Sequence, residues 1–107
     1  MTHRGEKLAE RVRALAATFL ANESNKTAMI TVTGCTVSED EKYATILISV
    51  LPEEKEKEAL SFCKRMRAPL RQYVKDNLNT YNIPFLETEI DIGEKARRRM
   101  DDIMRQG

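Results

Sequence analysis

The sequence predicts a small α+β domain in which helices cover one face of a three-stranded sheet. Two runs rich in β-branched residues lie about five polar residues apart, as in a β-hairpin. An amphipathic helical pattern precedes them, and a second one separates them from a third, alternating run. A length of 107 residues corresponds to one domain, and a hydrophobic content of 41% is enough for a core.

The first element is an amphipathic helix from Gly5 to about Asn22. Its apolar residues recur at the spacing of one helical face, while charged residues occupy the opposite side. The apolar positions are Leu8, Val12, Leu15, Ala16, Phe19 and Leu20.

The hairpin comprises two predicted strands, Met29–Val37 and Tyr43–Leu51, joined by the acidic segment Ser38–Lys42. Side chains alternate between the two faces of a strand. We therefore expect Ile30 and Val32 on one face. Their expected partners are Ala44, Ile46, Ile48 and Val50.

The second helical region is predicted to begin at Pro52, because proline suits the first helical position and two glutamates follow it. It continues to between Asn77 and Asn82. Pro69 interrupts it, since proline lacks a backbone N–H and its ring clashes with the carbonyl four residues earlier. The sequence thus predicts two helices with a kink at Ala68 and Pro69.

The third strand is predicted from Phe85 to Ile92, where apolar residues alternate with acids. After Gly93 the chain is short and highly charged, although its apolar residues keep helical spacing. Isolated helices of this length are marginal in water. We expect one domain over residues 1–93 and a charged tail, a frayed or conditional helix, over residues 94–107.

The composition offers no catalytic apparatus. His3 is the single histidine, so neither a histidine-based triad nor a multi-histidine metal site can form. Four scattered glycines exclude a P-loop and a dinucleotide fingerprint. We expect a protein that is not an enzyme, with no metal, no cofactor and no small-molecule substrate.

The cysteines and the hydropathy indicate a soluble protein of the cytoplasm. Cys35 and Cys63 lack a C-x-x-C spacing, and no signal peptide precedes them, which favours reduced thiols in or beside the core over a disulfide. No apolar run approaches the roughly 20 residues that span a bilayer. We therefore expect no membrane partner.

The second helical region carries a row of basic residues along one face, which we call the basic stripe. At about 100° per residue, Lys64, Arg67, Arg71 and Lys75 share one helical face, and Arg65 lies next to them. Residues 64–75 contain no Asp or Glu, although the net charge of the whole chain is only +1. Such segregation favours phosphate binding, but an ordinary solvated helix face explains it as well. In both interpretations we expect Arg67 and Arg71 to be exposed.

Two further features are ambiguous. Arg97, Arg98 and Arg99 form a second basic cluster, for which a simple charged tail is favoured over a binding site. Tyr43, Tyr73 and Tyr81 could stack on bases, but Tyr43 and Tyr73 also occupy positions that a core would claim.

The order of the elements is that of the type II KH domain, a small RNA-binding fold. This chain lacks the G-x-x-G loop of KH domains that bind single strands, and it resembles the ribosome-binding factor A family, which also lacks it. The resemblance is carried by the hairpin Ile30–Leu51, by Met66–Arg71 and by Asp91–Met104. The family kink is typically Ala-x-Gly, where this chain has Met66-Arg67-Ala68, and Gly93 replaces a serine usual after the third strand.

The resemblance implies a non-catalytic RNA chaperone that binds the free or immature 30S small ribosomal subunit and its 16S rRNA. It implies support for the late maturation and 5′-end processing of that rRNA, by a protein that we expect to be monomeric. The expected RNA-binding residues are Lys64, Arg65, Arg67, Arg71, Lys75, Arg97, Arg98 and Arg99. The alternative function is a protein-interaction or dimerisation module that uses the exposed sheet face or the C-terminal tail.

Overall fold

The computed structural model describes residues 3–23, 28–80 and 82–106, and its elements follow the predicted order. They are α1 (His3–Glu23), β1 (Met29–Val37), β2 (Tyr43–Leu51), the 3₁₀ turn η1 (Glu53–Lys55), α2 (Glu56–Arg65), α3 (Arg67–Asn77), β3 (Phe85–Ile90) and α4 (Ile92–Gln106). Both hairpin strands have the predicted bounds. The prediction that a helix begins at Pro52 is wrong by a few residues, because Pro52 precedes η1 and α2 begins only at Glu56.

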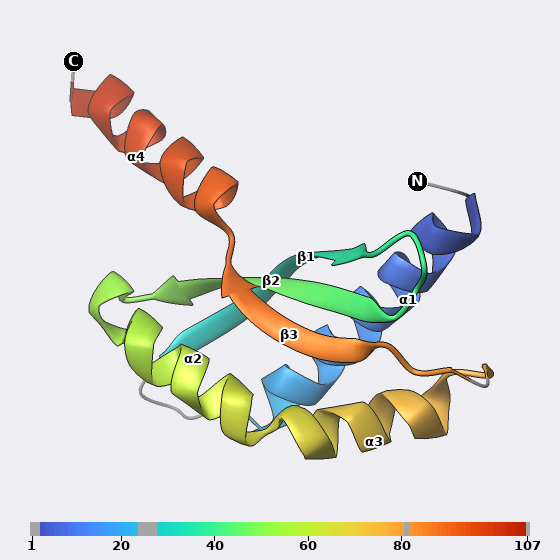
Figure 1. Ribbon diagram of the computed structural model, residues 1–107. Coiled ribbons are helices and arrows are strands. Elements are labelled where there is room, and N and C mark those ends of the chain that lie inside the picture. Colours follow the sequence, from blue (N-terminus) through green and yellow to red (C-terminus); the bar gives the residue numbers. More distant parts are fainter. Residues whose placement is uncertain (1–2, 24–27, 81, 107) are drawn as a thin grey trace.

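The sheet has β2 at its centre, antiparallel to β1 and parallel to β3 (Figure 1). Ile30 lies opposite Val50, and Val32 lies opposite Ile48, as predicted. Parallel neighbours require a long crossover, because the chain has to return to the same end of the sheet. Here η1, α2 and α3 supply that crossover.

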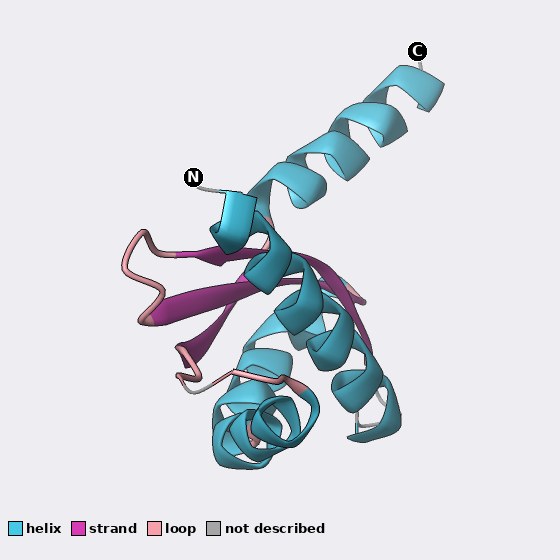
Figure 2. Cartoon of the chain, turned by 90° about the vertical axis from the view of Figure 1, so that its right-hand side faces the viewer, coloured by secondary structure: helices cyan, strands magenta, loops and turns pink. Residues whose placement is uncertain are grey.

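The core lies between the sheet and helices α1, α2 and α3, which cover one face (Figure 2). Four alternate residues of β2 are completely or almost completely buried in it, namely Ala44, Ile46, Ile48 and Val50. Val12, Ala16 and Leu20 of α1 and Leu70 and Val74 of α3 belong to the same core. No described helix covers the opposite face of the sheet, which confirms the predicted α+β architecture with helices on one face.

A β-bulge at Thr33 changes the alternation of β1. Val32 pairs with Ile48 and Gly34 with Leu47, so the strand register skips Thr33. Its hydroxyl lies 3.3 Å from the Leu47 carbonyl oxygen. The bulge moves Val37 to the buried face, opposite Ala44. Without it, strict alternation from Val32 would leave Val37 on the uncovered face.

The bend between the two crossover helices lies at Met66, not at Ala68 and Pro69 as predicted. Met66 has φ −90° and ψ 6°, outside the helical region, and it separates α2 from α3. Ala68 and Pro69 are the second and third residues of α3. At that position the missing N–H of proline is harmless, because the first N–H groups of a helix have no intrahelical acceptor. The ring of Pro69 therefore determines where α3 begins, and the backbone bends before it.

Asp91 lies between β3 and α4. Because β3 ends at Ile90, the predicted strand end at Ile92 is wrong by two residues. One carboxylate oxygen, Oδ1, accepts a hydrogen bond of 3.0 Å from the Glu94 N–H, as in a helix N-cap. The other, Oδ2, accepts one of 2.6 Å from the hydroxyl of Thr33. The residue displaced by the β1 bulge thereby fixes the start of α4.

Helix α4 runs from Ile92 to Gln106 and projects away from the domain (Figure 1). Ion pairs hold its first half to the start of the crossover. Lys95 Nζ lies 3.0 Å from Glu56 Oε1, and Arg99 Nη2 lies 3.2 Å from Glu53 Oε2. In the part of the chain that the structure describes, no helix is both long and apolar enough to cross a membrane.

We predict that Asp91→Ala lowers the free energy of unfolding by about 1 kcal/mol, the usual contribution of an N-cap. The Thr33 hydroxyl and the Glu94 N–H hold the pKa of Asp91 below its ordinary value of 3.8. A depressed folded-state pKa stabilises the protein above the unfolded pKa, and this contribution is lost as pH falls through the folded pKa. The difference between wild type and variant should therefore shrink below about pH 3.8. Urea unfolding of both proteins at several pH values measures this difference in the free energy of unfolding.

Asp101→Ala is the matched control, because Asp101 is exposed in the middle of the same helix. Equal losses for the two variants, or a difference that does not depend on pH, would show that Asp91 does not cap α4.

Candidate nucleic-acid interface

Helix α3 presents the centre of the basic stripe to solvent. Arg67, Arg71 and Lys75 recur every four residues and so lie on one face, whereas Leu70 and Val74 are buried on the other. Among the residues that the structure describes, no carboxylate forms an ion pair with any of these three cations. Their charge is therefore available to an external anion.

The bend at Met66 places the first cation of α3 close to the end of α2. Met66 caps both helices, so the end of α2 and the start of α3 meet there. The first turn of α3 contains no acidic residue. The charge of Arg67 is therefore not compensated within its own helical turn.

Arg67 is not fully exposed, which corrects the prediction. Its side chain is half-buried, and the guanidinium carbon lies 4.7 Å from the centroid of the Phe85 ring. The bend turns the first residue of α3 toward the start of β3, where the ring provides a cation–π contact. Arg67 thus contributes to packing as well as to charge.

A groove of about 280 Å³ separates the bend from β3. Lys64 and Arg67 line it from the helices, and Glu87 and Glu89 line it from the strand. Nothing in the sequence pattern placed these acids near the basic stripe, because about twenty residues separate them along the chain. An anion can approach from the helical side, while the carboxylates disfavour it along the strand.

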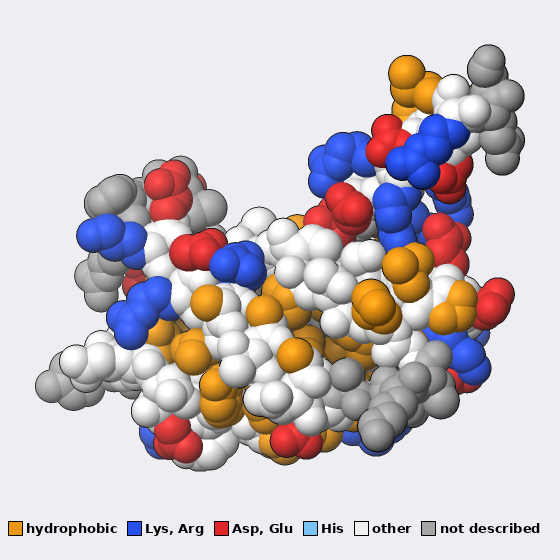
Figure 3. Space-filling model, turned by 180° about the vertical axis from the view of Figure 1, so that it is seen from behind, with side chains coloured by type: hydrophobic (Ala, Val, Ile, Leu, Met, Phe, Trp, Pro, Cys, Tyr) orange, Lys and Arg blue, Asp and Glu red, His pale blue; other side chains and the backbone are white. Residues whose placement is uncertain are grey.

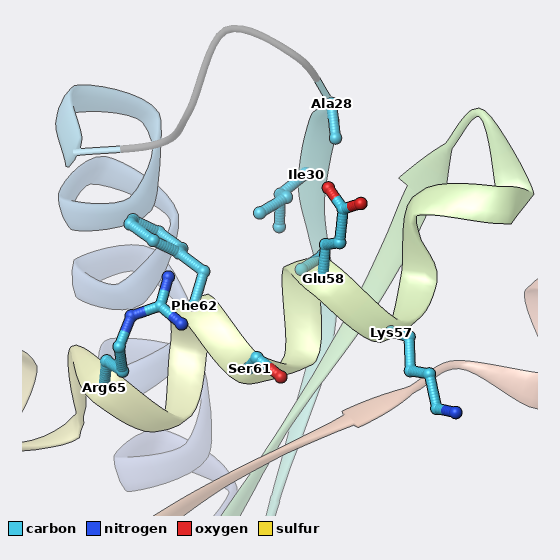
Figure 4. Close-up of a pocket in the computed structure, with 8 residues that line it drawn as sticks. Ala28, Ile30, Lys57, Glu58, Ser61, Phe62 and Arg65 are labelled. Atoms are coloured by element: carbon cyan, nitrogen blue, oxygen red, sulfur yellow. The ribbon is translucent and has the colours of Figure 1, made fainter.

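Arg65 faces a different hollow, although it follows Lys64 directly. This second hollow measures about 330 Å³ and is bounded by α2 and β1. Figure 4 shows Arg65 beside Phe62, with Ile30 across the hollow, whereas Lys57 points away. Successive residues of a helix diverge by about 100°, which separates Arg65 from the groove residues.

The cluster Arg97–Arg99 is largely paired with carboxylates of the same chain. Arg97 and Arg98 lie 3.1 and 3.9 Å from Glu94, and Arg99 contacts Glu53. Basic and acidic side chains are accordingly intermixed along α4 (Figure 3). The structure brings these three arginines together. More of their positive charge is compensated by nearby carboxylates than is the case for the cations of α3.

The two tyrosines that the structure describes at these positions have different surroundings. Tyr73 is half-buried, with its ring centroid 5.6 Å from that of Phe19, as expected for a core position. Tyr43 instead points outward and is 57% exposed. Tyr81 lies outside the described residues.

Phe85 is the site residue that the sequence interpretation missed. It is exposed and packs edge-on against Tyr43, with ring centroids 6.2 Å apart. A signal was present, because Phe85 alternates with the buried Leu86 and so shares the wet face of β3 with Glu87.

The thiols are unsuited to nucleophilic chemistry. Both are free, and burial raises the pKa of Cys35 to about 11 and also raises that of Cys63. Thiols with such pKa values remain protonated at neutral pH. Within residues 3–23, 28–80 and 82–106, no group of His, Cys, Asp and Glu is arranged to hold a metal ion.

The sequence matches a known protein family over almost its whole length. The family model described as ribosome-binding factor A matches residues 4–104. The chain belongs to the ribosome-binding factor A family. A ribosome-binding factor A from Fervidobacterium nodosum is 31% identical over 77 residues, which is 71% of this chain but only 62% of that relative.

Solved structures of the family show the same fold. The crystal structure of ribosome-binding factor A from Thermus thermophilus superimposes with a TM-score of 0.72 at 17% identity, over 80% of this chain and 94% of that one. A homology model of the Thermus thermophilus protein, fitted into an electron cryomicroscopy map of a complex with the 30S subunit, superimposes with a TM-score of 0.67 at 18% identity. The match covers 84% of this chain and 93% of that one. At these identities the likeness concerns the fold.

We predict that Arg67→Ala lowers the free energy of unfolding by about 0.5–1 kcal/mol, because it removes the contact with Phe85. Arg71→Ala, a matched truncation on the solvated face, should change it by less than about 0.5 kcal/mol. Chemical denaturation compares the two variants. Indistinguishable stabilities would mean that the contact between Arg67 and Phe85 contributes nothing to folding.

Proposed function

We propose that this member of the ribosome-binding factor A family binds the small ribosomal subunit through the phosphates of 16S rRNA. The observation that carries the proposal is the row of cations at and after the bend, which have no carboxylate partners in the described chain. Arg71 and Lys75 are the primary phosphate contacts, joined by Lys64 and Arg67 at the groove. Arginine and lysine contacts to phosphate are the main source of affinity in such complexes.

One related structure supports the choice of partner, because it represents the Thermus thermophilus factor in a complex with the 30S subunit. The missing G-x-x-G loop supports phosphate binding over the clamping of a short single strand. A rigid helix with regularly spaced cations instead fits a folded RNA surface.

The protein acts as a monomeric RNA chaperone in the cytoplasm and catalyses no reaction itself. It binds the free or immature subunit and supports late maturation and 5′-end processing of 16S rRNA. It can do so only by differential binding, because a ligand shifts an equilibrium by no more than its preference for one conformation.

Secondary contacts come from Arg65 and from Arg97, Arg98 and Arg99. Arg65 lies on the other side of α2, so it would reach a different rRNA segment from the α3 residues. The three arginines of α4 would have to exchange their contacts with Glu94 and Glu53 for phosphates. We therefore rank them below the basic stripe.

The double variant Arg71→Glu, Lys75→Glu should bind free small subunits roughly tenfold more weakly or worse, because it replaces two phosphate contacts by repulsion. Cosedimentation at increasing salt measures the affinity. Each lost phosphate contact should also make the dependence of log K on log salt shallower, by about 1. Both residues are exposed, so thermal stability should stay close to that of wild type.

The matched control is Lys7→Glu, Arg11→Glu, which makes the same charge change at exposed positions of α1. The wild-type protein should prefer the free small subunit over the large subunit and the whole ribosome. Equal binding to all three particles, or equal losses for the two double variants, would contradict the proposal.

A second candidate function is dimerisation through α4. Ile92, Met100, Ile103 and Met104 are strongly exposed, and at about 100° per residue they lie on one face of the helix. Apolar residues on one face of a helix are typical of helix-to-helix interfaces.

Sedimentation equilibrium decides between the two candidates. Our first proposal predicts a monomer over the micromolar range, with no change in the variant Met100→Glu, Met104→Glu. A dimer that this variant dissociates would instead support the second candidate.

A further inference from the structure

We propose that Tyr43, Phe85 and Arg67 form a stacking site for one unpaired rRNA base, next to the phosphate-binding face of α3. We call these three residues the aromatic platform. The inference rests on the proposed function and deepens it, because it adds a contact with a base to contacts with phosphates.

The register of the sheet places the two rings side by side. Tyr43 begins β2, Phe85 begins β3, and the two residues are partners in the parallel pair. The next residues, Ala44 and Leu86, are 1% and 2% exposed and point into the core. Because side chains alternate along a strand, Tyr43 and Phe85 both stand on the uncovered face.

Both rings are partly exposed to solvent, although burying apolar surface would be favourable. Tyr43 is 57% exposed and Phe85 is 43% exposed, and their planes meet at 71°. No helix of the described chain covers this face of the sheet (Figure 2). Exposed aromatic faces beside one another provide surfaces on which the flat face of a base can stack.

Arg67 connects the rings to the basic stripe. Its guanidinium lies 4.7 Å from the centre of the Phe85 ring, and Arg67 lines the groove together with Lys64. A guanidinium plane stacks on bases much as an aromatic ring does, and it also contacts phosphate. Sites for a base and for its phosphate therefore adjoin at the bend.

The acids of β3 determine which part of the RNA can reach the rings. Glu87 and Glu89 follow Phe85 at alternate, exposed positions, so they share its face of the strand. Their carboxylates repel phosphates, which confines the RNA backbone to the side of α3. A base that is unpaired and turned out of its helix can still reach the rings, whereas bases of a duplex remain stacked inside it.

The chemistry favours RNA over a protein as the occupant. Aromatic residues and arginine are also common at the centres of protein interfaces. Here, however, Arg67 is followed along α3 by Arg71 and Lys75, which form no ion pair with any residue that the structure describes. In RNA a phosphate lies next to every base. The same rings bound by a ribosomal protein would show no protected base, and the test uses this difference.

The test measures the affinity of the full-length protein for free small subunits and the chemical reactivity of rRNA bases in the complex. Tyr43→Leu and Phe85→Leu keep an apolar side chain but remove the ring. Each should weaken binding roughly tenfold, the usual effect of losing one stacked base. The salt dependence should not change, because no phosphate contact is lost. Tyr43→Phe should bind like the wild type, and Leu51→Ala, at the opposite end of β2 on the same face, is the control.

At least one base should be protected by the wild type and by Tyr43→Phe, and become reactive with Tyr43→Leu while neighbouring protections persist. Wild-type affinity of both leucine variants, with thermal stability retained, would overturn the inference. Weaker binding without any change in base protection would also overturn it, in favour of a protein partner.

A different outcome would show that the proposed function is wrong. In that case the wild-type protein itself would show no preference for the small subunit, and the aromatic platform would be refuted together with the proposed function. If the reversal of Arg71 and Lys75 abolishes binding while the leucine variants bind normally, only the aromatic platform is refuted.

Discussion

The burial of one face of β2 is the constraint on which the rest of the structure depends. Its four core residues, from Ala44 to Val50, are buried because β2 has a strand on each side and helices across one face. Burying such side chains supplies most of the stability available to a domain of this size. Since α1, α2 and α3 all pack on that face, no described helix covers the other one. The way in which the core is packed thus determines which face of the sheet is exposed to solvent.

The parallel pairing of β2 with β3 determines where the candidate interface lies. Parallel strands require a crossover, and this crossover is a pair of helices separated at Met66. Pro69 makes the break necessary because its ring excludes a continuous helix. The break makes Arg67 the first residue of α3 and places its guanidinium over the ring of Phe85. A single proline therefore shapes both the core crossover and the charged surface.

The same residue type has different roles at different places in the fold. The arginines of α4 lie close to glutamates of α4 and η1, so much of their charge is compensated within the chain. The cations along α3 lack such partners among the described residues. The sequence shows both clusters equally well. Because ion pairing depends on distances in space, only the folded chain distinguishes them.

Most elements could be predicted from periodicity, since one-sided burial leaves a mark every two residues in a strand and every three or four in a helix. The bounds of β1 and β2, the family and the presence of a bend follow from the sequence alone. Three features were decided by the tertiary structure. The bulge at Thr33 depends on pairing with β2, the cap of α4 depends on contact between Thr33 and Asp91, and the outward position of Tyr43 depends on which face the helices cover. The periodicity of a segment shows which of its residues will be buried. It does not show which distant segment will pack against them.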